Sequence, residues 1–277
     1  MSKKIALVAN STWNIYNFRQ NIIKKIIDQG HEVVVFAPID EYITYKENYH
    51  NVKHIGLKSL DRDSINPIKD FLLILELYRK YKKEQPDLII HYTHKPNIFG
   101  SFAARLCGIK SISIVTGLGY GFIRKGWLNE VMIKLYQLTA GKKGLIIFEN
   151  IDDQELFKEL NIIEDKKSAN VNGCGVDTTF YFPIIKEQTS PPFIFTFIGR
   201  LLKDKGVREF ATVARDLNEK YKGEVKFVML GDFDPENPST IDKEDLLQWI
   251  QNGFIEYKGF VRDVRPYIAQ SDCVVLP

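Results

Sequence analysis

Residues 193–210 read FIFTFIGRLLKDKGVREF, and this stretch decides the fold. The run 193–198 is apolar and rich in Phe and Ile, which predicts a strand that is buried on both faces. Gly199 and Arg200 begin a short polar turn, Gly206 ends it, and the residues that follow have helical spacing. A buried strand, a turn and a helix together form the repeating unit of a parallel sheet covered by helices.

The same unit recurs along the 277 residues of the chain. Short apolar runs rich in Val and Ile predict further buried strands, and amphipathic stretches between them predict helices. We expect strands at 4–9, 32–37, 88–92, 111–115, 144–148, 193–198, 225–230, 254–257 and 273–276. We expect helices at 17–29, 67–83, 97–106, 207–221, 242–251 and 264–270. This order predicts an α/β fold with parallel sheets.

A polar stretch divides the chain. Residues 178–192 contain three prolines among polar residues, which is typical of a linker. The length allows two domains, each large enough to bury its own core. We therefore predict a first domain at 1–177, a linker at 178–192 and a second domain at 193–277. Because no helix follows the last predicted strand, we expect the second domain to be incomplete and the chain to be truncated.

Cysteine usage and hydropathy exclude several classes of protein. Cys107, Cys174 and Cys273 are widely spaced, so neither a disulfide framework nor a structural zinc site is indicated, and a reducing cytoplasm fits best. The longest apolar run, 71–77, is much shorter than the roughly 20 residues of a membrane span. We therefore expect a cytoplasmic protein without a transmembrane helix.

Basic residues are concentrated in one part of the chain, although the net charge is only +3. Between His91 and Lys143, eight Lys and Arg residues accompany a single acid, Glu130. Aromatic and apolar residues alternate with them in 119–143, which is typical of a surface that binds anionic lipid. The alternatives are a helix packed in its own domain with a solvated basic edge, and nucleic-acid binding, for which we find no recognition motif. The residues assigned to the membrane surface are Arg124, Lys125, Trp127 and Lys134.

The turn after strand 193–198 has the chemistry of an anion site. Gly199 and Arg200 are followed by Lys205 and Gly206 just before a helix. Parallel sheets bind ligands at the carboxyl ends of their strands, helix N-termini offer unpaired N–H groups, and Arg and Lys donate charged hydrogen bonds to phosphate. This pattern indicates a diphosphate site. The alternative is a solvated turn that only closes the entry to the helix.

Two features of the first half also follow strands. The loop 117–121 reads GLGYG, in which the third Gly comes one residue too early for a dinucleotide fingerprint. We interpret it as a substrate loop, with a flexible loop that binds nothing as the alternative. His94 is expected to face the same crevice, whereas His91 lies within a strand and is expected in the core. Their spacing on a strand end does not favour a shared metal.

These motifs, taken together, resemble those of the retaining GT-B glycosyltransferases of family four. The second-half motifs are Asn172 with 175–177 and Phe180, 197–200 with 205–206, Gly231, 259–264, and 271–277. The segments 15–19, 94–100, 117–119 and 234–239 are similar to the bacterial subgroup that adds N-acetylgalactosamine to lipid-diphosphate-linked sugars. The resemblance extends from Ile5 to Pro277.

The resemblance implies a GT-B architecture of two Rossmann-like domains. It implies transfer of a hexose or N-acetylhexosamine from a UDP-sugar to a polyprenol-diphosphate-linked saccharide with retention, at the inner face of the membrane. It implies neither a metal nor a cofactor besides the UDP-sugar co-substrate. The implied donor-binding residues are Gly199, Arg200, Lys205, Gly231, Phe260, Val261, Gly117 and Gly119. The implied acceptor-binding residues are Asn14, Asn17, Arg19 and His94.

The chain departs from the family pattern in two places. Many members of the family carry a His in the loop that corresponds to Thr116 to Gly119. This chain has TGLG there, as the lipid-sugar subgroup does. The acidic E-x-seven-E motif of the family would begin beyond Pro277, so no catalytic residue is assigned, and we expect residues 1–277 to bind a donor without turnover. The remaining alternatives are a GT-B sugar epimerase or phosphorylase and a non-catalytic fragment that binds a membrane or a partner enzyme.

Overall fold

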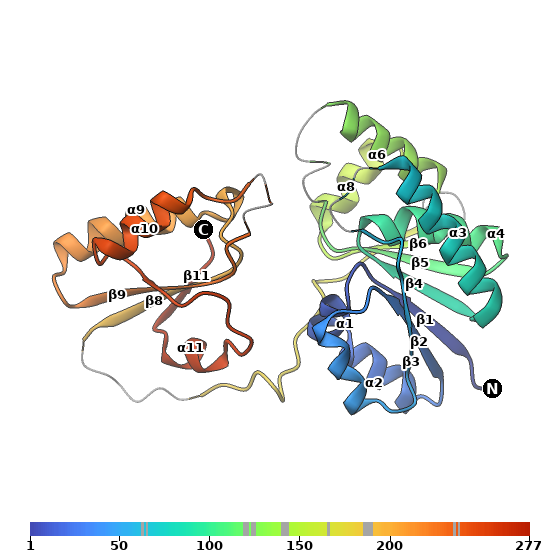
Figure 1. Cartoon of the computed structure of the whole chain (residues 1–277), viewed down its shortest axis with the longest axis horizontal. Helices are drawn as coiled ribbons and strands as arrows, with labels where there is room; N and C mark the ends of the chain where they lie inside the picture. Colours follow the sequence, from blue (N-terminus) through green and yellow to red (C-terminus); the bar gives the residue numbers. More distant parts are fainter. Residues whose placement is uncertain are drawn as a thin grey trace. The chain divides into compact units, whose positions relative to one another are not determined.

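The computed structural model describes residues 1–61, 64, 66–118, 122, 126–139, 144–164, 167–184, 191–234, 237 and 239–277. The chain forms two compact units, Met1–Val176 and Asp177–Pro277, and each unit contains its own sheet (Figure 1). The division falls one residue before the end of the predicted first domain. The predicted linker, 178–192, belongs to the second unit.

The sheet of the first unit is parallel, and its strands lie in the order β3-β2-β1-β4-β5-β6-β7. The strands are β1 (Lys4–Val8), β2 (Glu32–Ala37), β3 (Lys53–Gly56), β4 (Leu88–Tyr92), β5 (Lys110–Val115), β6 (Leu145–Phe148) and β7 (Ser168–Asn170). The direction of strand addition reverses between β1 and β4. Such a switch point opens a crevice at the carboxyl ends of the strands.

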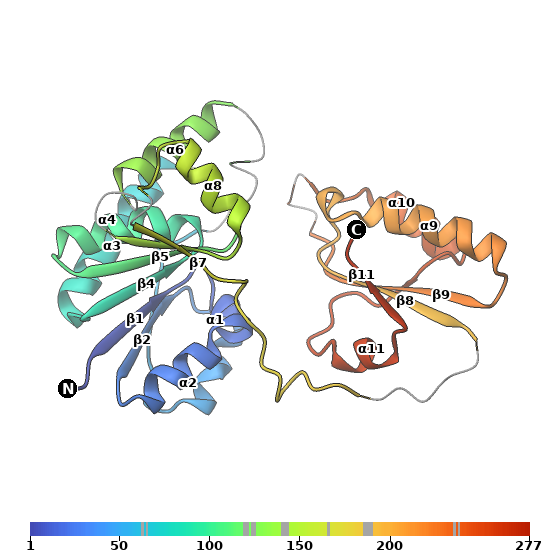
Figure 2. The same cartoon turned by 180° about the vertical axis from the view of Figure 1, so that it is seen from behind.

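Helices cover both faces of this sheet (Figures 1 and 2). They are α1 (Thr12–Phe18), α2 (Gln20–Asp28), α3 (Pro67–Glu84), α4 (Ser101–Leu106), α6 (Trp127–Leu138) and α8 (Ile151–Glu159), with the short helices η1 (Glu41–Asn48) and η2 (Pro96–Gly100). Strand β1 alternates between the two layers: Ala6 and Val8 pack in one core with α3 and α4, and Leu7 and Ala9 pack in the other with α1 and α2. Side chains from α6 and α8 join a third core beside β5 and β6.

The second unit repeats the architecture on a smaller scale. Its described strands are β8 (Phe193–Ile198), β9 (Val225–Leu230), β10 (Glu256–Tyr257) and β11 (Cys273–Val275), parallel in the order β10-β9-β8-β11. The helices are η4 (Lys203–Lys205), α9 (Val207–Lys220), α10 (Lys243–Gln251) and α11 (Arg265–Gln270). Helices α9 and α10 cover one face, and α11 lies on the other (Figures 1 and 2). The predicted α/β fold with parallel sheets is therefore confirmed.

The predicted helix 17–29 is wrong in its boundaries. The structure has α1 and α2 instead, with a break at Arg19, whose backbone angles are φ −119° and ψ −2°. The side chain of Ser11 caps α1 by accepting a hydrogen bond from the N–H of Asn14. The break matters because it turns the side chain of Arg19 toward the sheet, where it is buried.

In the described part of the chain, no helix combines the length and the apolar character needed to cross a bilayer.

Candidate functional site

Three glycines meet where the strands of the second sheet end. The N–H of Gly199 donates to the carbonyl of Leu230, and the N–H of Gly231 donates to the carbonyl of Gly259, both at 2.9 Å. Gly231 has a φ of +155°, and a Cβ atom at this position would lie 1.7 Å from the carbonyl oxygen of Gly199. Only glycine permits this approach of the two strand ends, and it leaves backbone without side chains at the edge where parallel sheets bind ligands.

Two exposed basic side chains lie in the turn that follows Gly199. Arg200 and Lys205 lie on the turn that joins β8 to α9, and both are exposed. Ser239 holds this turn, because its carbonyl accepts from the N–H of Lys203 at 2.7 Å and its hydroxyl donates to Asp204 at 2.6 Å. The hydrogen bond from Ser239 lowers the pKa of the Asp204 carboxyl. No ion pair joins Arg200 or Lys205 to an acid among the residues that the structure describes, so both cations are available to an anionic ligand.

The remaining predicted donor residues of the second unit lie at the same edge of the sheet. Gly206 begins α9 with a φ of +68°, and a Cβ there would lie 2.3 Å from the Cβ of Pro277, so the residues after β11 end beside the start of this helix. Phe260 and Val261 follow Gly259, and the side chain of Phe260 is exposed. The structure thus brings Gly199, Arg200, Lys205, Gly231, Phe260 and Val261 to one edge of one sheet.

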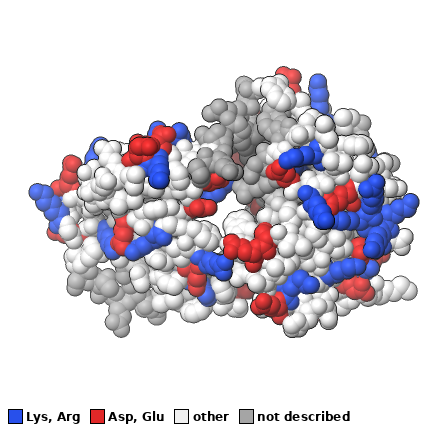
Figure 3. Space-filling model, viewed as in Figure 1, with Lys and Arg blue, Asp and Glu red and all other residues white. Residues whose placement is uncertain are grey.

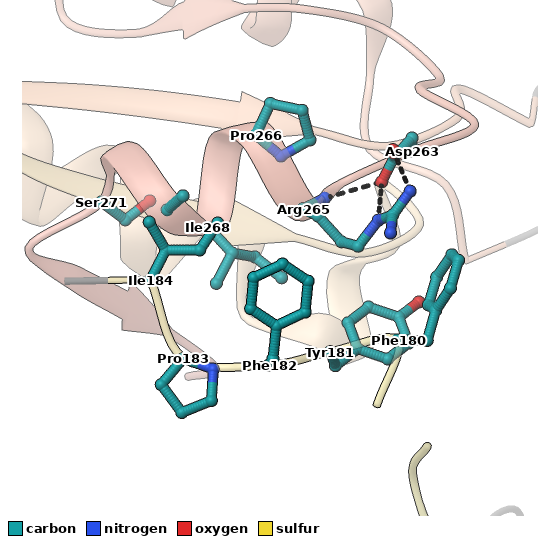
Figure 4. Close-up of a pocket in the computed structure, with 11 residues that line it drawn as sticks. Phe180, Tyr181, Phe182, Pro183, Ile184, Asp263, Arg265, Pro266, Ile268 and Ser271 are labelled. Carbon is teal, nitrogen blue, oxygen red and sulfur yellow. Dashed lines mark hydrogen bonds and ion pairs between the residues drawn. The ribbon is translucent and has the colours of Figure 1, made fainter. Parts of the chain in front are cut away.

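A separate recess of about 750 Å³ lies beside α11 (Figure 4). Its walls are aromatic and aliphatic residues from 180–184 and from α11. The guanidinium of Arg265 stacks 3.7 Å from the ring centroid of Phe180 and is paired with Asp263 at 2.8 Å. The charge of Arg265 is therefore already compensated, and the recess has the character of an apolar packing surface rather than of a diphosphate site.

In the first unit, Arg19 is the centre of a buried polar cluster at the switch point. Its Nε donates to Oδ1 of Asn14 at 3.3 Å, and its Nη1 lies 3.5 Å from Oε1 of Glu149. Its guanidinium also stacks 4.0 Å from the ring centroid of Tyr92. We call Asn14, Arg19, Tyr92 and Glu149 the Arg19 cluster. Arg19 is only 3% exposed, whereas the side chain of Glu149 retains 15%.

Burial perturbs the titration of this cluster. Desolvation raises the pKa of the Glu149 carboxyl, and Arg19 offsets part of that effect. Burial also raises the pKa of the Tyr92 hydroxyl to about 12. Tyr92 has no hydrogen-bond partner for this hydroxyl among the described residues. The cluster thus places a compensated charge pair beside a neutral hydroxyl group.

His94 belongs to an adjacent aromatic cluster. Its Nδ1 lies 2.9 Å from the hydroxyl of Tyr136, and its ring stacks on that of Phe122. Burial lowers the pKa of His94, so the ring is neutral at pH 7. Thr93, directly before it, has a φ of +70°, which a β-branched residue rarely adopts. This unusual backbone lies where β4 ends, at the edge that the sequence indicated.

Two other residues of the first unit were predicted to bind substrate, and each lies outside the two clusters described above. Asn17 is exposed on α1, and its side-chain amide donates to the carbonyl of Trp13 at 2.9 Å. Gly117 has a φ of +121°, and a Cβ there would meet open space. Glycine is therefore required at position 117 by the backbone conformation and not by a lack of space. Gly119 lies outside the described residues.

The predicted membrane surface is described only in part. Arg124 and Lys125 lie outside the described residues, whereas Trp127 and Lys134 are exposed on α6. Trp127, Val131, Lys134 and Leu138 have spacings of three and four, so they share one face of the helix, and the apolar members are 71%, 41% and 55% exposed. Basic side chains also gather on the side of the first unit where α3 and α4 lie, among interspersed acids (Figure 3).

Two of the basic residues counted toward this surface have partners within the fold. Lys95 pairs with Asp70 at 2.7 Å, and both side chains are largely buried. Arg105 donates to the carbonyl of Leu138 at 3.0 Å and stacks on the ring of Phe102. The basic stretch of the sequence is therefore not a uniformly free surface.

Sequence reasoning missed Glu149 and Tyr92. Glu149 is the first residue after β6, and its N–H donates to the carbonyl of Val115, the last residue of β5, at 3.2 Å. A charged residue directly after a buried strand was the available signal. Tyr92 gave no signal, because an aromatic residue at the end of an apolar run is typical of core. No group of three or more metal-ligating side chains converges within the residues that the structure describes.

Two α/β units, each built on its own parallel sheet, are the architecture of GT-B glycosyltransferases. The chain belongs to the glycosyl transferase 4-like family, whose model matches residues 4–150. The model described as glycosyl transferases group 1 matches residues 192–277. The resemblance to glycosyltransferases is thereby confirmed, and the epimerase or phosphorylase alternative is set aside.

Two curated relatives share this family character. One, from Campylobacter jejuni, is named N,N'-diacetylbacillosaminyl-diphospho-undecaprenol alpha-1,3-N-acetylgalactosaminyltransferase; it is 29% identical over 99% of this chain and 74% of its own length. The other, from Escherichia coli, is named UDP-Gal:alpha-D-GlcNAc-diphosphoundecaprenol alpha-1,3-galactosyltransferase; it is 29% identical over 87% of this chain and 63% of its own length. Both relatives are longer than this chain.

Solved structures agree on the fold. Anabaena HepE, in complex with UDP and glucose, aligns with a TM-score of 0.72 and 17% identity over 99% of this chain and 74% of its own. A sucrose-phosphate synthase from Thermosynechococcus elongatus aligns with a TM-score of 0.72 and 13% identity over 99% of this chain and 75% of its own. At these identities the likeness shows the GT-B fold alone.

Proposed function

We propose that the protein transfers a hexose or N-acetylhexosamine from a UDP-sugar to a polyprenol-diphosphate-linked saccharide, with retention at the anomeric carbon. The family match and the names of the two curated relatives support this substrate class. The observation that supports the donor side is the glycine-lined edge of the second sheet with two exposed cations, Arg200 and Lys205, that form no ion pair with a described acid.

On the donor side, the second unit binds the UDP moiety. Arg200 and Lys205 donate charged hydrogen bonds to the diphosphate, which Arg can do in a bidentate manner. Negative charge builds on the diphosphate as the sugar leaves, so the same contacts strengthen in the transition state. Gly199 and Gly231 let the ligand approach the backbone, and Phe260 and Val261 contact the uracil base. In this proposal the loop at Gly117 and Gly119 lies beside the transferred sugar.

On the acceptor side, Asn14, Asn17, Arg19 and His94 line the carboxyl edge of the first sheet. Because Arg19 is buried in an ion pair, we assign it to positioning its neighbours. His94 is neutral, lies with Nδ1 beside the hydroxyl of Tyr136 and is hydrogen-bonded to the backbone of Leu118, so its ring brings no positive charge to this edge. This side therefore suits sugar hydroxyls.

The lipid part of the acceptor brings the protein to the cytoplasmic face of a membrane, where it binds peripherally. The exposed face of α6, with Trp127, Val131, Lys134 and Leu138, supports this proposal, because an aromatic and aliphatic face with a cation suits the headgroup region. Neither a metal nor a nucleic acid takes part in the proposed reaction. The catalytic acids remain unassigned.

Isothermal titration calorimetry of UDP binding to residues 1–277 tests the donor site. Arg200→Ala removes a charged hydrogen bond and should weaken binding by about 1.5–3 kcal/mol. Lys220→Ala is a charge-matched control, because Lys220 ends α9 at the far end of the helix from the site. Equal affinities of the wild type and Arg200→Ala would contradict the assignment.

Transfer is tested separately with a radiolabelled UDP-sugar and a polyprenol-diphosphate sugar. We expect binding without turnover for residues 1–277, because positioning of the reacting carbon demands contacts to the donor sugar that the implied acidic motif supplies. A longer chain that carries this motif should transfer the label. Turnover by residues 1–277 would show that the catalytic groups lie among the residues described above.

A further inference from the structure

Glu149 is the accessible member of the Arg19 cluster. Its Oε1 lies 3.5 Å from Arg19, and no other donor contacts its carboxylate among the described residues. A carboxylate accepts at about four lone-pair positions, so most of its capacity is unused. Because Glu149 is 15% exposed and Arg19 is 3% exposed, the carboxylate is the member of this ion pair that is accessible to a ligand.

The backbone of Glu149 is held on both sides. Its N–H donates to the carbonyl of Val115 at 3.2 Å, and its carbonyl accepts from the N–H of Gly173 at 3.0 Å. Val115 ends β5, two residues before Gly117. The carboxylate thus extends from a fixed position at the carboxyl edge of the sheet, which is the placement that a specific hydrogen bond to a ligand requires.

The charge of this cluster selects the kind of ligand. Arg19 is compensated by Glu149, so an approaching phosphate would gain little from the guanidinium and would be repelled by the carboxylate. A hydroxyl group instead donates to the carboxylate in a charge-assisted hydrogen bond. The cluster therefore favours a neutral polyhydroxyl ligand over an anionic one.

The hydroxyl of Tyr92 is a second observation at the same place. It is fully buried and has no partner among the described residues, which is an expensive arrangement that folding alone does not favour. Its ring supports the guanidinium of Arg19 at 4.0 Å. Tyr92 and Arg19 together hold the carboxylate of Glu149 at the entrance of the cluster.

We propose that Glu149 accepts a hydrogen bond from a hydroxyl group of the acceptor saccharide, with Arg19 and Tyr92 as positioning residues. This inference rests on the proposed function and narrows it. It assigns the Arg19 cluster to the sugar of the acceptor and not to its diphosphate.

The test measures the affinity of residues 1–277 for two soluble probes, farnesyl diphosphate and farnesyl diphosphate that carries N-acetylglucosamine. Glu149→Gln keeps the shape of the side chain and removes its charge. We expect it to weaken binding of the sugar-bearing probe about tenfold or more and not to weaken binding of the bare lipid diphosphate. Glu155→Gln on α8 is the matched control, because Glu155 is exposed and undergoes the same change of charge.

Circular dichroism and urea unfolding establish that each variant is folded. If Glu149→Gln does not fold, Glu149→Asp is used in its place. This variant keeps the negative charge opposite Arg19, and its side chain is shorter by one methylene, which moves the carboxylate away from the ligand. It should also weaken the sugar-bearing probe selectively. Equal weakening of both probes, or no weakening of either by the folded variant, would overturn the inference.

The two levels of proposal fail in different ways. If the wild type binds neither probe, the proposed acceptor class is wrong and this inference fails with it. If the wild type binds the sugar-bearing probe and the Glu149 variants bind it equally well, the acceptor class stands and this inference alone is wrong.

Discussion

The replacement Gly231→Ala tests whether the close approach of two strand ends forms the donor site. The new Cβ would lie 1.7 Å from the carbonyl oxygen of Gly199, whereas real Cβ atoms come no closer than 3.0 Å, so the two strand ends must separate by about 1.3 Å, the difference of these distances. The atoms that clash are backbone on both sides, and no side-chain rotation relieves the contact. The separation would strain the hydrogen bonds that tie Gly199 and Gly231 to the neighbouring strands.

The magnitude follows from two contributions. A non-glycine residue at a positive φ costs about 1 kcal/mol, and overpacking adds about 1–3 kcal/mol. Gly223→Ala is a control for a positive φ without a clash, because Gly223 has a φ of +79° and a Cβ there would meet no atom within 4 Å. We therefore expect Gly231→Ala to lower the free energy of unfolding by about 1–3 kcal/mol more than Gly223→Ala does.

Urea unfolding followed by circular dichroism measures the stability, and calorimetry measures UDP binding. Gly231→Ala should also weaken UDP binding at least tenfold, about 1.4 kcal/mol, because Arg200 follows the displaced Gly199 directly. Gly223→Ala should bind UDP as the wild type does, since Gly223 lies before β9, at the opposite end of that strand. If the two variants are equally stable, or if Gly231→Ala keeps its UDP affinity, the edge of the second sheet is not built as described.

Further predictions concern the first unit. Trp127→Ala and Lys134→Glu should each reduce sedimentation of the protein with anionic liposomes. The effect of Lys134→Glu should vanish as the salt concentration is raised, because salt screens the charge. Equal binding of the wild type to neutral and anionic vesicles would contradict the electrostatic contribution. The pKa of Glu149 is raised in the folded state, so Glu149 stabilises the fold most at low pH. The difference in unfolding free energy between the wild type and Glu149→Gln should therefore fall as pH rises from about 4.5 through the raised pKa. Urea titrations at several pH values measure this difference. The lowered pKa of His94 has the opposite consequence: its contribution to stability should be lost as pH falls below about 6.5, and His94→Gln should abolish this loss. Tyr92→Phe removes a buried hydroxyl without a described partner and should leave the urea midpoint unchanged or raised; a large loss of stability would reveal a partner.

The central strands could be predicted because their burial leaves a continuous apolar run. Strand β3 (Lys53–Gly56) and strand β7 (Ser168–Asn170) were missed, since they lie at the two edges of the sheet. Edge strands are covered less completely, so their sequences carry few apolar residues, and β7 reads SAN. Helix α8 was missed for a related reason, because Phe157 is its only fully buried residue.

The donor motif was predictable from its residue types, but the close approach of Gly231 to Gly199 was not. The sequence presents Gly223 and Gly231 as equivalent turn residues, since both bracket the strand β9. Only the paired strands show that Gly231 faces the carbonyl of Gly199, a contact between positions 32 residues apart in the numbering of the chain. The requirement for glycine at Gly231 is thus a property of the sheet.

The surroundings of Arg19 could not be predicted from the sequence. The resemblance implies only that Arg19 contacts the acceptor. The break between α1 and α2 turns it inward, where Glu149 compensates it across 130 positions of the chain. The pairing of Arg19 with Glu149 has no local sequence signal, because it depends on how β1 and β6 are ordered in the sheet.

The cations at the carboxyl edges of the two sheets differ in whether they form ion pairs within the protein. At the second sheet, Arg200 and Lys205 are exposed and form no ion pair with a described acid, so they favour a ligand that brings negative charge. At the first sheet, the charge of Arg19 is compensated, the neighbouring imidazole of His94 is neutral, and the group that remains for a ligand is the carboxylate of Glu149. A diphosphate bound there would have to displace an internal ion pair from a buried position, which costs several kcal/mol. The Arg19 cluster can therefore recognise only uncharged groups of the acceptor, such as hydroxyls, and the diphosphate of a lipid-linked acceptor must find its counter-charges elsewhere on the protein.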